Sequence, residues 1–424
     1  MSINTLPISL PYLISSSTNP YARPGQWLLG TAGLVVGMIH VGGVTRLTQS
    51  GLSMTTWSPV GTLPPLNQQE WEAEFARYRQ FPEWEQRKNM TLRDFQFIYA
   101  WEYGHRMMGR LIGLVYTLPW LYFSVRGKLP PPLPSPGSWT SSLSYQPRLA
   151  ALGLLGAGQG LVGWWMVKSG LGEDRRGDRQ EIRVQPVRLA AHLSVALATY
   201  GGLLWTALDM MSWPHTTTST TTGGANAALA TTNTATAATT SAGRLQTMVA
   251  SIAPKALTTL RRVRMGAGLL TGLTAVTIAS GALVAGNDAG KAYNTWPRMS
   301  DDAYFVVSEA WPANLSVFTA ATKDTATTQG NHRLLATGTA LTGLAVVGGA
   351  AALAPAAALT PQVRQGLAAV GVTVLGQYTL GVVTLLNYVP ISLAAAHQVG
   401  SLAVFSSGLY LTHALRYASR RLVR

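Results

Sequence analysis

Residues 102–106 read Glu-Tyr-Gly-His-Arg, and residues 329–333 read Gln-Gly-Asn-His-Arg. Each motif opens a long apolar stretch, and three other landmarks recur in the same order around the two motifs. The first landmark is a Gly and a Trp six residues apart, at Gly51 and Trp57 and again at Gly290 and Trp296. The second is Gln-x-x-x-Gly, at 159–163 and 377–381, and the third is Ala-His, at 191–192 and 396–397. Four landmarks in one order indicate that the chain contains an internal duplication.

The apolar stretches predict the fold class. Each is close to the roughly 20 apolar residues that a helix needs to cross a membrane. Only 12% of the chain is charged, against about 25% in soluble proteins. We predict an all-α integral membrane protein with eight transmembrane helices, arranged as two pseudo-symmetric four-helix bundles in a parallel internal repeat. The expected spans are 26–47, 95–124, 148–168, 188–211, 265–286, 328–354, 362–386 and 391–415.

Composition divides the chain further. Residues 215–243 are mostly Thr, Ala, Gly and Ser, which is typical of a flexible linker. The polar stretch 66–94 is rich in Trp, Glu and Arg, and it predicts one or two short interfacial helices. We expect Trp57, Trp71 and Trp84 to lie near the lipid headgroups. The predicted segments are an N-terminal segment (1–25), an N-terminal bundle (26–211), a low-complexity linker (212–262), a C-terminal bundle (263–418) and a tail (419–424).

The charges of the chain suit a membrane. The formal charge is +15, but no basic stripe with interleaved aromatic residues appears. We therefore expect loop ends near anionic lipid and no nucleic-acid site. All acidic residues except Asp209 fall in alternate connections or at the start of the second span, which favours both termini inside. Residues 1–24 hold one Arg and match neither a cleavable presequence nor a secretory signal.

Four of the seven histidines lie at repeated landmarks, near the same end of the even-numbered spans: His105, His192, His332 and His397. Two imidazoles in each half are what a bis-histidine haem iron requires, with the porphyrin in the bundle core. We predict that these four residues bind haem iron. Bare zinc or copper is less favoured, because such sites add carboxylate or thiolate ligands and the chain has no Cys. His40, His215 and His413 have no repeat partner, and we interpret them as structural or solvated.

Two further features accompany the histidines. A small residue follows each of them four positions later, on the same helix face: Gly109, Ala196, Ala336 and Ser401. Such residues leave room for a flat macrocycle, although ordinary packing of membrane helices uses them too. Arg106 and Arg333 directly follow two of the histidines. Each could pair with a haem propionate or extend to the interface, and the sequence leaves both readings open.

The halves differ at one titratable position. Glu102 lies three residues before His105 on the same helix face, and the equivalent residue before His332 is Gln329. A buried carboxylate can act as a general base or stabilise a cationic intermediate. We therefore predict a reacting haem in the N-terminal half and a fixed haem in the C-terminal half. The alternative is that Glu102 only pairs with Arg106 or another Arg.

These motifs resemble those of a known family. The runs at 42–54, 102–106, 165–171, 188–192, 284–290, 331–333 and 395–398 are similar to those of the haem A synthases, most closely the mitochondrial and alphaproteobacterial branch. The resemblance covers about residues 24–418. The branch with a cysteine pair in its first outer loop is excluded, because this chain has no Cys.

The resemblance implies an activity and its cofactors. Haem A synthases oxidise the C8 methyl group of haem O to a formyl group, giving haem A for the terminal oxidase, with haem B as cofactor. By resemblance, His105 and His192 would flank haem O beside Glu102, and His332 and His397 would hold haem B. The implied location is the mitochondrial inner membrane, or the plasma membrane in a bacterium. The implied partners are haem O synthase and oxidase assembly factors, whereas the electron-transfer partner and a homo-oligomeric state are left open.

Two other functions fit parts of the pattern. A dihaem cytochrome with an electron-transfer role only would use the same four histidines, but it would need no titratable group in one half. A transporter or assembly protein without haem would place its special residues near the membrane midplane. Here they gather near one face, which favours the enzyme.

Overall fold

The computed structural model describes residues 19–56, 58, 60–130, 145–172, 182–212, 252–301, 303–305 and 307–418. Within these ranges the chain is helical and forms no strand. The long helices are α1 (Ala22–Leu47), α3 (Leu92–Val125), α4 (Tyr145–Lys168), α5 (Pro186–Met211), α7 (Pro254–Gly286), α10 (Thr325–Leu353), α11 (Pro361–Leu386) and α12 (Ile391–Ala414). The predicted all-α class is confirmed.

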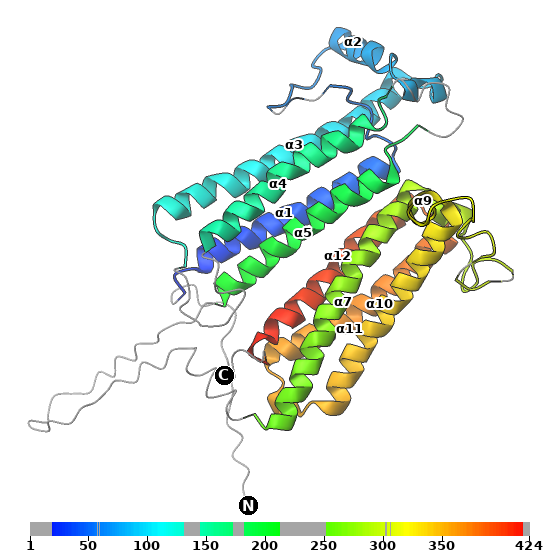
Figure 1. Ribbon diagram of the computed structural model, residues 1–424. Coiled ribbons are helices and arrows are strands. Elements are labelled where there is room, and N and C mark those ends of the chain that lie inside the picture. Colours follow the sequence, from blue (N-terminus) through cyan, green and yellow to red (C-terminus); the bar gives the residue numbers. More distant parts are fainter. Residues whose placement is uncertain are drawn as a thin grey trace, which may run out of the picture.

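The long helices lie in two groups. Helices α1, α3, α4 and α5 lie together, and so do α7, α10, α11 and α12 (Figure 1). Between the groups, α5 packs on α7, and both α1 and α5 pack on α12. The apolar core crosses this seam, because Leu402 and Phe405 of α12 belong to the same buried cluster as Leu197 and Leu203 of α5.

Six of these helices are long and apolar enough to cross a membrane: α1, α4, α5, α7, α10 and α11. Helix α3 carries Glu102, Arg106 and Arg110, and α12 carries His397 and Gln398. These polar residues lower the hydropathy of α3 and α12. Length and composition thus support six of the eight predicted spans.

One predicted boundary is wrong. The linker was expected to run to residue 262, yet α7 already begins at Pro254. The basic residues before 265 mark the start of the apolar stretch, and the predicted span began there. Leu, Ala and Arg also favour helix, so the helix extends toward the N-terminus beyond the apolar part. Leu257 and Leu260 on this extension are buried against the C-terminal core. Residues 1–18, 213–251 and 419–424, which include His215, lie outside the described residues.

The predicted short helices are present between α1 and α3. They are α2 (Gln68–Tyr78), whose first turn is capped by Asn67, and the 3-10 helix η1 (Pro82–Gln86). Trp71 and Trp84 pack on a buried aromatic cluster that includes Phe75 and Phe95. This cluster fixes both short helices over the start of α3, whereas Trp57 lies outside the described residues. The remaining elements are α8 (Ala289–Ala292), α9 (Val317–Lys323), η3 (Ala356–Ala358) and η4 (Arg416–Ala418).

Ion pairs join the two groups at both ends. At the end that carries α2 and α9, here called the site end, Arg46 of α1 donates to the carbonyl oxygen of Ala285 at 2.8 Å and lies 4.0 Å from Asp288. At the opposite end, Asp209 of α5 pairs with Arg148 of α4 at 2.7 Å and with His413 of α12 at 3.0 Å. His413 is only 3% exposed, which fits the structural role expected for it.

We expect Asp209→Ala to destabilise the fold by about 3 kcal/mol. The substitution leaves Arg148 and His413 partly buried without their shared carboxylate, and breaking a buried pair from one side is costly. Thermal unfolding of the purified protein in detergent would measure the loss. Asp301→Ala removes an exposed carboxylate and serves as the control. Equal melting temperatures for the two variants would contradict this role of Asp209.

Candidate functional site

The four predicted histidines come from four different helices and line one cavity. They are His105 on α3, His192 on α5, His332 on α10 and His397 on α12. The cavity has a volume of about 1740 Å³ and extends through both helix groups. This exceeds the roughly 300–1,000 Å³ of an ordinary small-molecule pocket. The site therefore has room for ligands much larger than a typical metabolite.

The histidines form one pair in each half. His105 and His192 lie close enough to interact electrostatically, and so do His332 and His397. Within the described residues, no three His, Asp or Glu side chains gather closely enough to hold a bare metal ion. The donor set of each half is therefore two imidazoles inside a largely apolar bundle. That set fits a metal whose other ligands come from a macrocycle.

Each imidazole lies against a glycine of the neighbouring helix. A Cβ atom added at Gly163 would meet His192 at 3.2 Å, one at Gly281 would meet His332 at 3.2 Å, and one at Gly381 would meet His397 at 2.8 Å. In these three cases the nearest ring atom is Cε1. At Gly42 the added atom would meet Nε2 of His105 at 2.9 Å, so this ring is turned differently. The four glycines let the imidazoles approach helix backbones that any side chain would keep away.

The sequence contained a signal for these glycines. Gly163 and Gly381 end the repeated Gln-x-x-x-Gly runs, and Gly42 and Gly281 fall in register when Gly51 is aligned with Gly290. Their role was not predicted, because the repeat does not say which residues meet across helices. The predicted small residues do line the cavity: Gly109, Ala196, Ala336 and Ser401.

Hydrogen bonds support the imidazoles of the C-terminal half. Ser280 Oγ lies 2.7 Å from Nδ1 of His332, and Gln377 Nε2 lies 3.0 Å from Nδ1 of His397. Both contacts fix the ring that they touch. The Ser280 hydroxyl can accept from Nδ1–H of His332, which leaves Nε2 of that ring available for a metal, whereas the Gln377 amide donates to Nδ1 of His397 and only orients that ring.

The N-terminal half lacks this support at the equivalent positions. Gln159 donates to the backbone oxygen of His192 at 3.1 Å, but Nδ1 of His192 is buried and has no hydrogen-bond partner among the described residues. Val41 stands where the C-terminal half has Ser280, so α1 offers His105 no side-chain hydroxyl there. The repeat therefore keeps the histidines and changes what holds them.

The two predicted arginines bind loop backbone in the same way. Arg106 donates to the carbonyl oxygens of Thr56 at 2.6 Å and Met54 at 2.9 Å. Arg333 donates to those of Thr295 at 2.6 Å and Tyr293 at 3.2 Å, which are the equivalent positions of the repeat. Each guanidinium thus ties the loop that follows α1 or α7 to the site end of the cavity.

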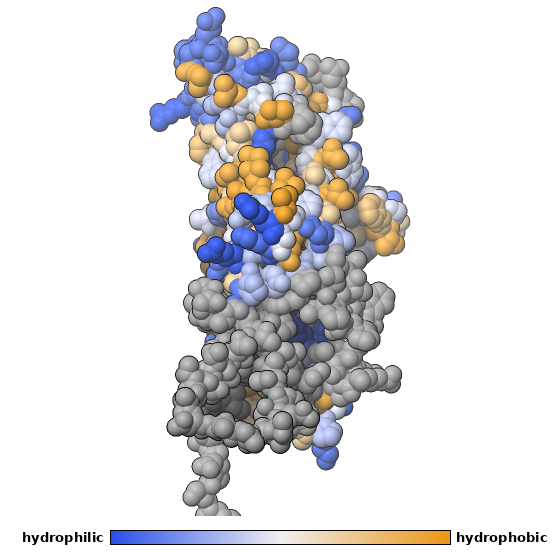
Figure 2. Space-filling model, turned by 90° about the vertical axis from the view of Figure 1, so that its left-hand side faces the viewer, coloured by the Kyte–Doolittle hydropathy of each residue, from blue (hydrophilic) through white to orange (hydrophobic). Residues whose placement is uncertain are grey.

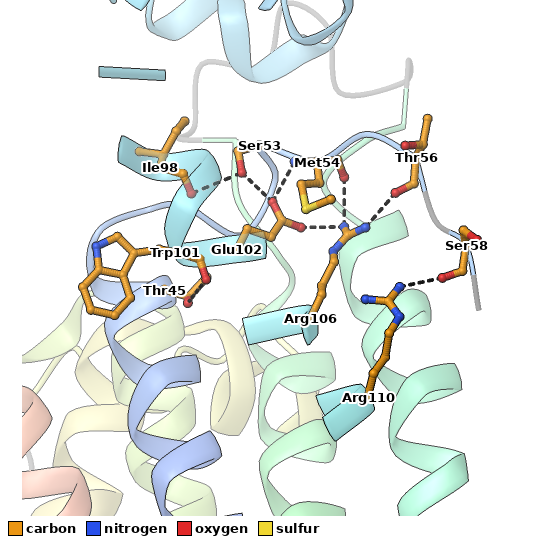
Figure 3. Close-up of polar contacts among 10 residues, drawn as sticks. All are labelled: Thr45, Ser53, Met54, Thr56, Ser58, Ile98, Trp101, Glu102, Arg106 and Arg110. Carbon is orange, nitrogen blue, oxygen red and sulfur yellow. Dashed lines mark hydrogen bonds and ion pairs between the residues drawn. The ribbon is translucent and has the colours of Figure 1, made fainter. Parts of the chain in front are cut away.

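The halves differ in the charge beside these arginines. Glu102 is 2% exposed and accepts hydrogen bonds from Ser53 Oγ at 2.7 Å, from the Met54 amide at 2.7 Å and from Arg106 at 2.5 Å (Figure 3). The pairing with Arg106 that the sequence left as the alternative is therefore present. Gln329 makes only a long contact of 3.4 Å to the carbonyl of Tyr293, and its Oε1 atom is buried without a partner in the described part of the chain.

Comparison with known proteins identifies the family. The family model COX15-CtaA, described as cytochrome oxidase assembly protein, matches residues 25–253 and 228–409. The chain belongs to this family. It is 39% identical to "Heme A synthase COX15" of Arabidopsis thaliana, over 98% of this chain and 79% of the relative. It is 37% identical to "Heme A synthase" of Maricaulis maris, over 93% and 96%, and 39% identical to "Heme A synthase COX15" of Homo sapiens, over 92% and 82%. The resemblance to haem A synthases is thereby confirmed.

We expect Gly381→Ala to destabilise the protein by about 1–3 kcal/mol, the usual cost of overpacking. The added methyl group would meet His397 at 2.8 Å, so the ring or α12 must move. Gly376→Ala, on the same helix, is the matched control, because its Cβ atom meets nothing within 4 Å. Thermal unfolding would compare the two variants, and equal stability would show that the contact with His397 is not tight.

Proposed function

We propose that this chain is a haem A synthase, which oxidises the C8 methyl group of haem O to the formyl group of haem A. The proposal rests on the four paired imidazoles, which face one cavity from four helices. It is supported by relatives at 37–39% identity over more than nine-tenths of the chain, each named heme A synthase. The product, haem A, would serve the terminal oxidase, which agrees with the description of the family as cytochrome oxidase assembly proteins.

We infer that α3 and α12 also cross the membrane, which gives eight spans in two pseudo-symmetric bundles. On α3, Leu111, Leu114, Leu118 and Leu121 are more than half exposed, as side chains that face lipid would be. Hydrophobic side chains gather between hydrophilic regions on the face drawn in Figure 2. The relatives include eukaryotic and alphaproteobacterial proteins. We place the chain in the mitochondrial inner membrane, with a bacterial plasma membrane as the alternative.

The two halves would divide the work. His105 and His192 would flank haem O, and His332 and His397 would hold haem B as the resident cofactor. Bound haem B would supply redox chemistry that side chains lack. The protein's own residues would position the methyl group, exclude water and fix the imidazoles. Glu102 lies beside the substrate half, where we propose that it takes part in the oxidation.

Buried donor atoms favour a propionate partner for Arg333. Its Nε and Nη1 atoms are buried and have no hydrogen-bond partner among the described residues. The side chain is 5% exposed, so extension to water at the interface does not satisfy these atoms. A haem propionate would accept from them. The case for Arg106 is weaker, because Glu102 already neutralises it.

A dihaem cytochrome with an electron-transfer role only remains the competing function. It would hold both haems permanently, whereas the differences between Glu102 and Gln329 and between Val41 and Ser280 favour two unlike sites. Extraction and mass analysis of the haems bound to the purified full-length protein would decide between them. Haem O or haem A beside haem B would support the enzyme, and haem B alone in both sites would support the cytochrome.

We expect Glu102→Ala to abolish formyl production while haem B stays bound. The substitution removes a buried carboxylate that lies three residues before His105 on α3, and it leaves the C-terminal imidazoles untouched. Mass analysis of extracted haem would report both quantities. Glu72→Ala, which removes an exposed carboxylate on α2, is the control. Loss of haem B together with formyl production would count against the division of labour.

We expect His332→Ala and His397→Ala each to strip haem B from the protein. Either substitution removes one of the two proposed axial ligands in the C-terminal half. Haem content per protein, measured from the Soret absorbance and by extraction, would show the loss. His40→Ala is the control, because His40 lies on α1 outside the proposed ligand set. Unchanged haem B content would refute the ligand assignment.

A further inference from the structure

The arginine of the N-terminal half is already neutralised. Arg106 makes an ion pair with Glu102, and both of its Nη atoms also donate to loop carbonyls. Glu102 in turn is saturated by Ser53 and the Met54 amide. This network, drawn in Figure 3, closes on itself and leaves little uncompensated charge for an incoming anion.

The arginine of the C-terminal half lacks such a partner. Gln329 replaces the carboxylate, and no ion pair to Arg333 is formed within the described residues. Gln329 is 3% exposed and Arg333 5% exposed, and both have buried polar atoms without partners. A buried cation without a counter-charge is unfavourable, so an anionic group held there is strongly stabilised.

Within the described part of the chain, the imidazoles also have more hydrogen-bond partners in the C-terminal half than in the N-terminal half. In the C-terminal half, Ser280 contacts Nδ1 of His332, and Gln377 contacts Nδ1 of His397. In the N-terminal half, Val41 replaces Ser280, and Nδ1 of His192 has no partner among the described residues. A ring that is already ordered, with Nε2 free, loses less freedom on binding a metal, so His332 is better prepared for this than His105.

We propose that the two halves differ in how long they keep a haem. The difference is set by two residues at equivalent positions of the repeat, Glu102 and Gln329. Gln329 leaves Arg333 free to hold a haem propionate, so the C-terminal half retains its haem. Glu102 occupies Arg106, so the N-terminal half releases its haem after reaction. Ser280 acts as a positioning residue for the retained haem through Nδ1 of His332. The inference rests on the proposed function, because it needs haem in both halves.

The reciprocal exchange of the two residues tests the inference. Full-length protein is loaded with haem B and haem O under anaerobic conditions with no added oxidant, so that the methyl group of haem O is not oxidised. Excess apomyoglobin then captures released haem, and the haem left on the protein is extracted and identified by mass over time. We expect wild-type protein to lose haem O faster than haem B.

We expect Gln329→Glu to speed the release of haem B and Glu102→Gln to slow the release of haem O, each by about tenfold. A charge-assisted contact of this kind is commonly worth a tenfold change or more in dissociation. Glu72→Gln and Gln68→Glu make the same chemical changes on exposed positions of α2 and should leave both rates unchanged. Melting temperatures would confirm that all four variants are folded.

A second exchange covers the case in which a buried charge prevents folding. Ser280→Ala removes one hydroxyl and Val41→Ser introduces one at the equivalent position, so neither adds a charge. We expect Ser280→Ala to speed the release of haem B and Val41→Ser to slow that of haem O. The absorption spectrum and reduction potential of haem B should also shift in Ser280→Ala, which a purely structural role would not cause.

The outcomes separate the two proposals. Release rates that stay at wild-type values in Gln329→Glu and Ser280→Ala, in a protein that still converts haem O to haem A, would overturn this inference alone. Equal release of haem O and haem B from wild-type protein would also overturn it. A wild-type protein that binds no haem would overturn the proposed function and this inference together.

Discussion

Four imidazoles lie where a neighbouring helix has no side chain, and the site depends on this close approach. Gly42, Gly163, Gly281 and Gly381 each bring a histidine ring against helix backbone. Helices that pack in a membrane gain little from apolar burial between them, so small residues at their contacts decide how close they come. The same contacts that pack the bundle therefore also set the depth and spacing of the paired nitrogens.

In the proposed function, a repeated arrangement of residues would carry two unlike haem sites. The arginines bind equivalent loop carbonyls at equivalent repeat positions, and the histidines lie over equivalent glycines. The side chains that differ around this frame include Glu102 against Gln329 and Val41 against Ser280. Because the frame is shared, these side chains can change charge and hydrogen bonding without altering the fold.

The repeat and the hydropathy of the sequence predicted the long helices, the pairing of histidines and the small residues that line the cavity. They did not predict the start of α7 at Pro254, because a membrane boundary is not a helix boundary. The glycines opposite the histidines and the partners of Glu102 depend on which helix faces meet. A single sequence records periodicity along a helix, but it does not record rotation of one helix against the next.

Helix α5 packs on α7 and α12, and Asp209 of α5 pairs with His413 of α12; two separate copies of a bundle could form this kind of interface as a dimer. In a dimer of identical chains, every mutation appears twice, so both sites must stay alike. Once two copies are joined in one polypeptide, each can mutate alone. A single chain can therefore carry Glu102 in one half and Gln329 at the equivalent position of the other.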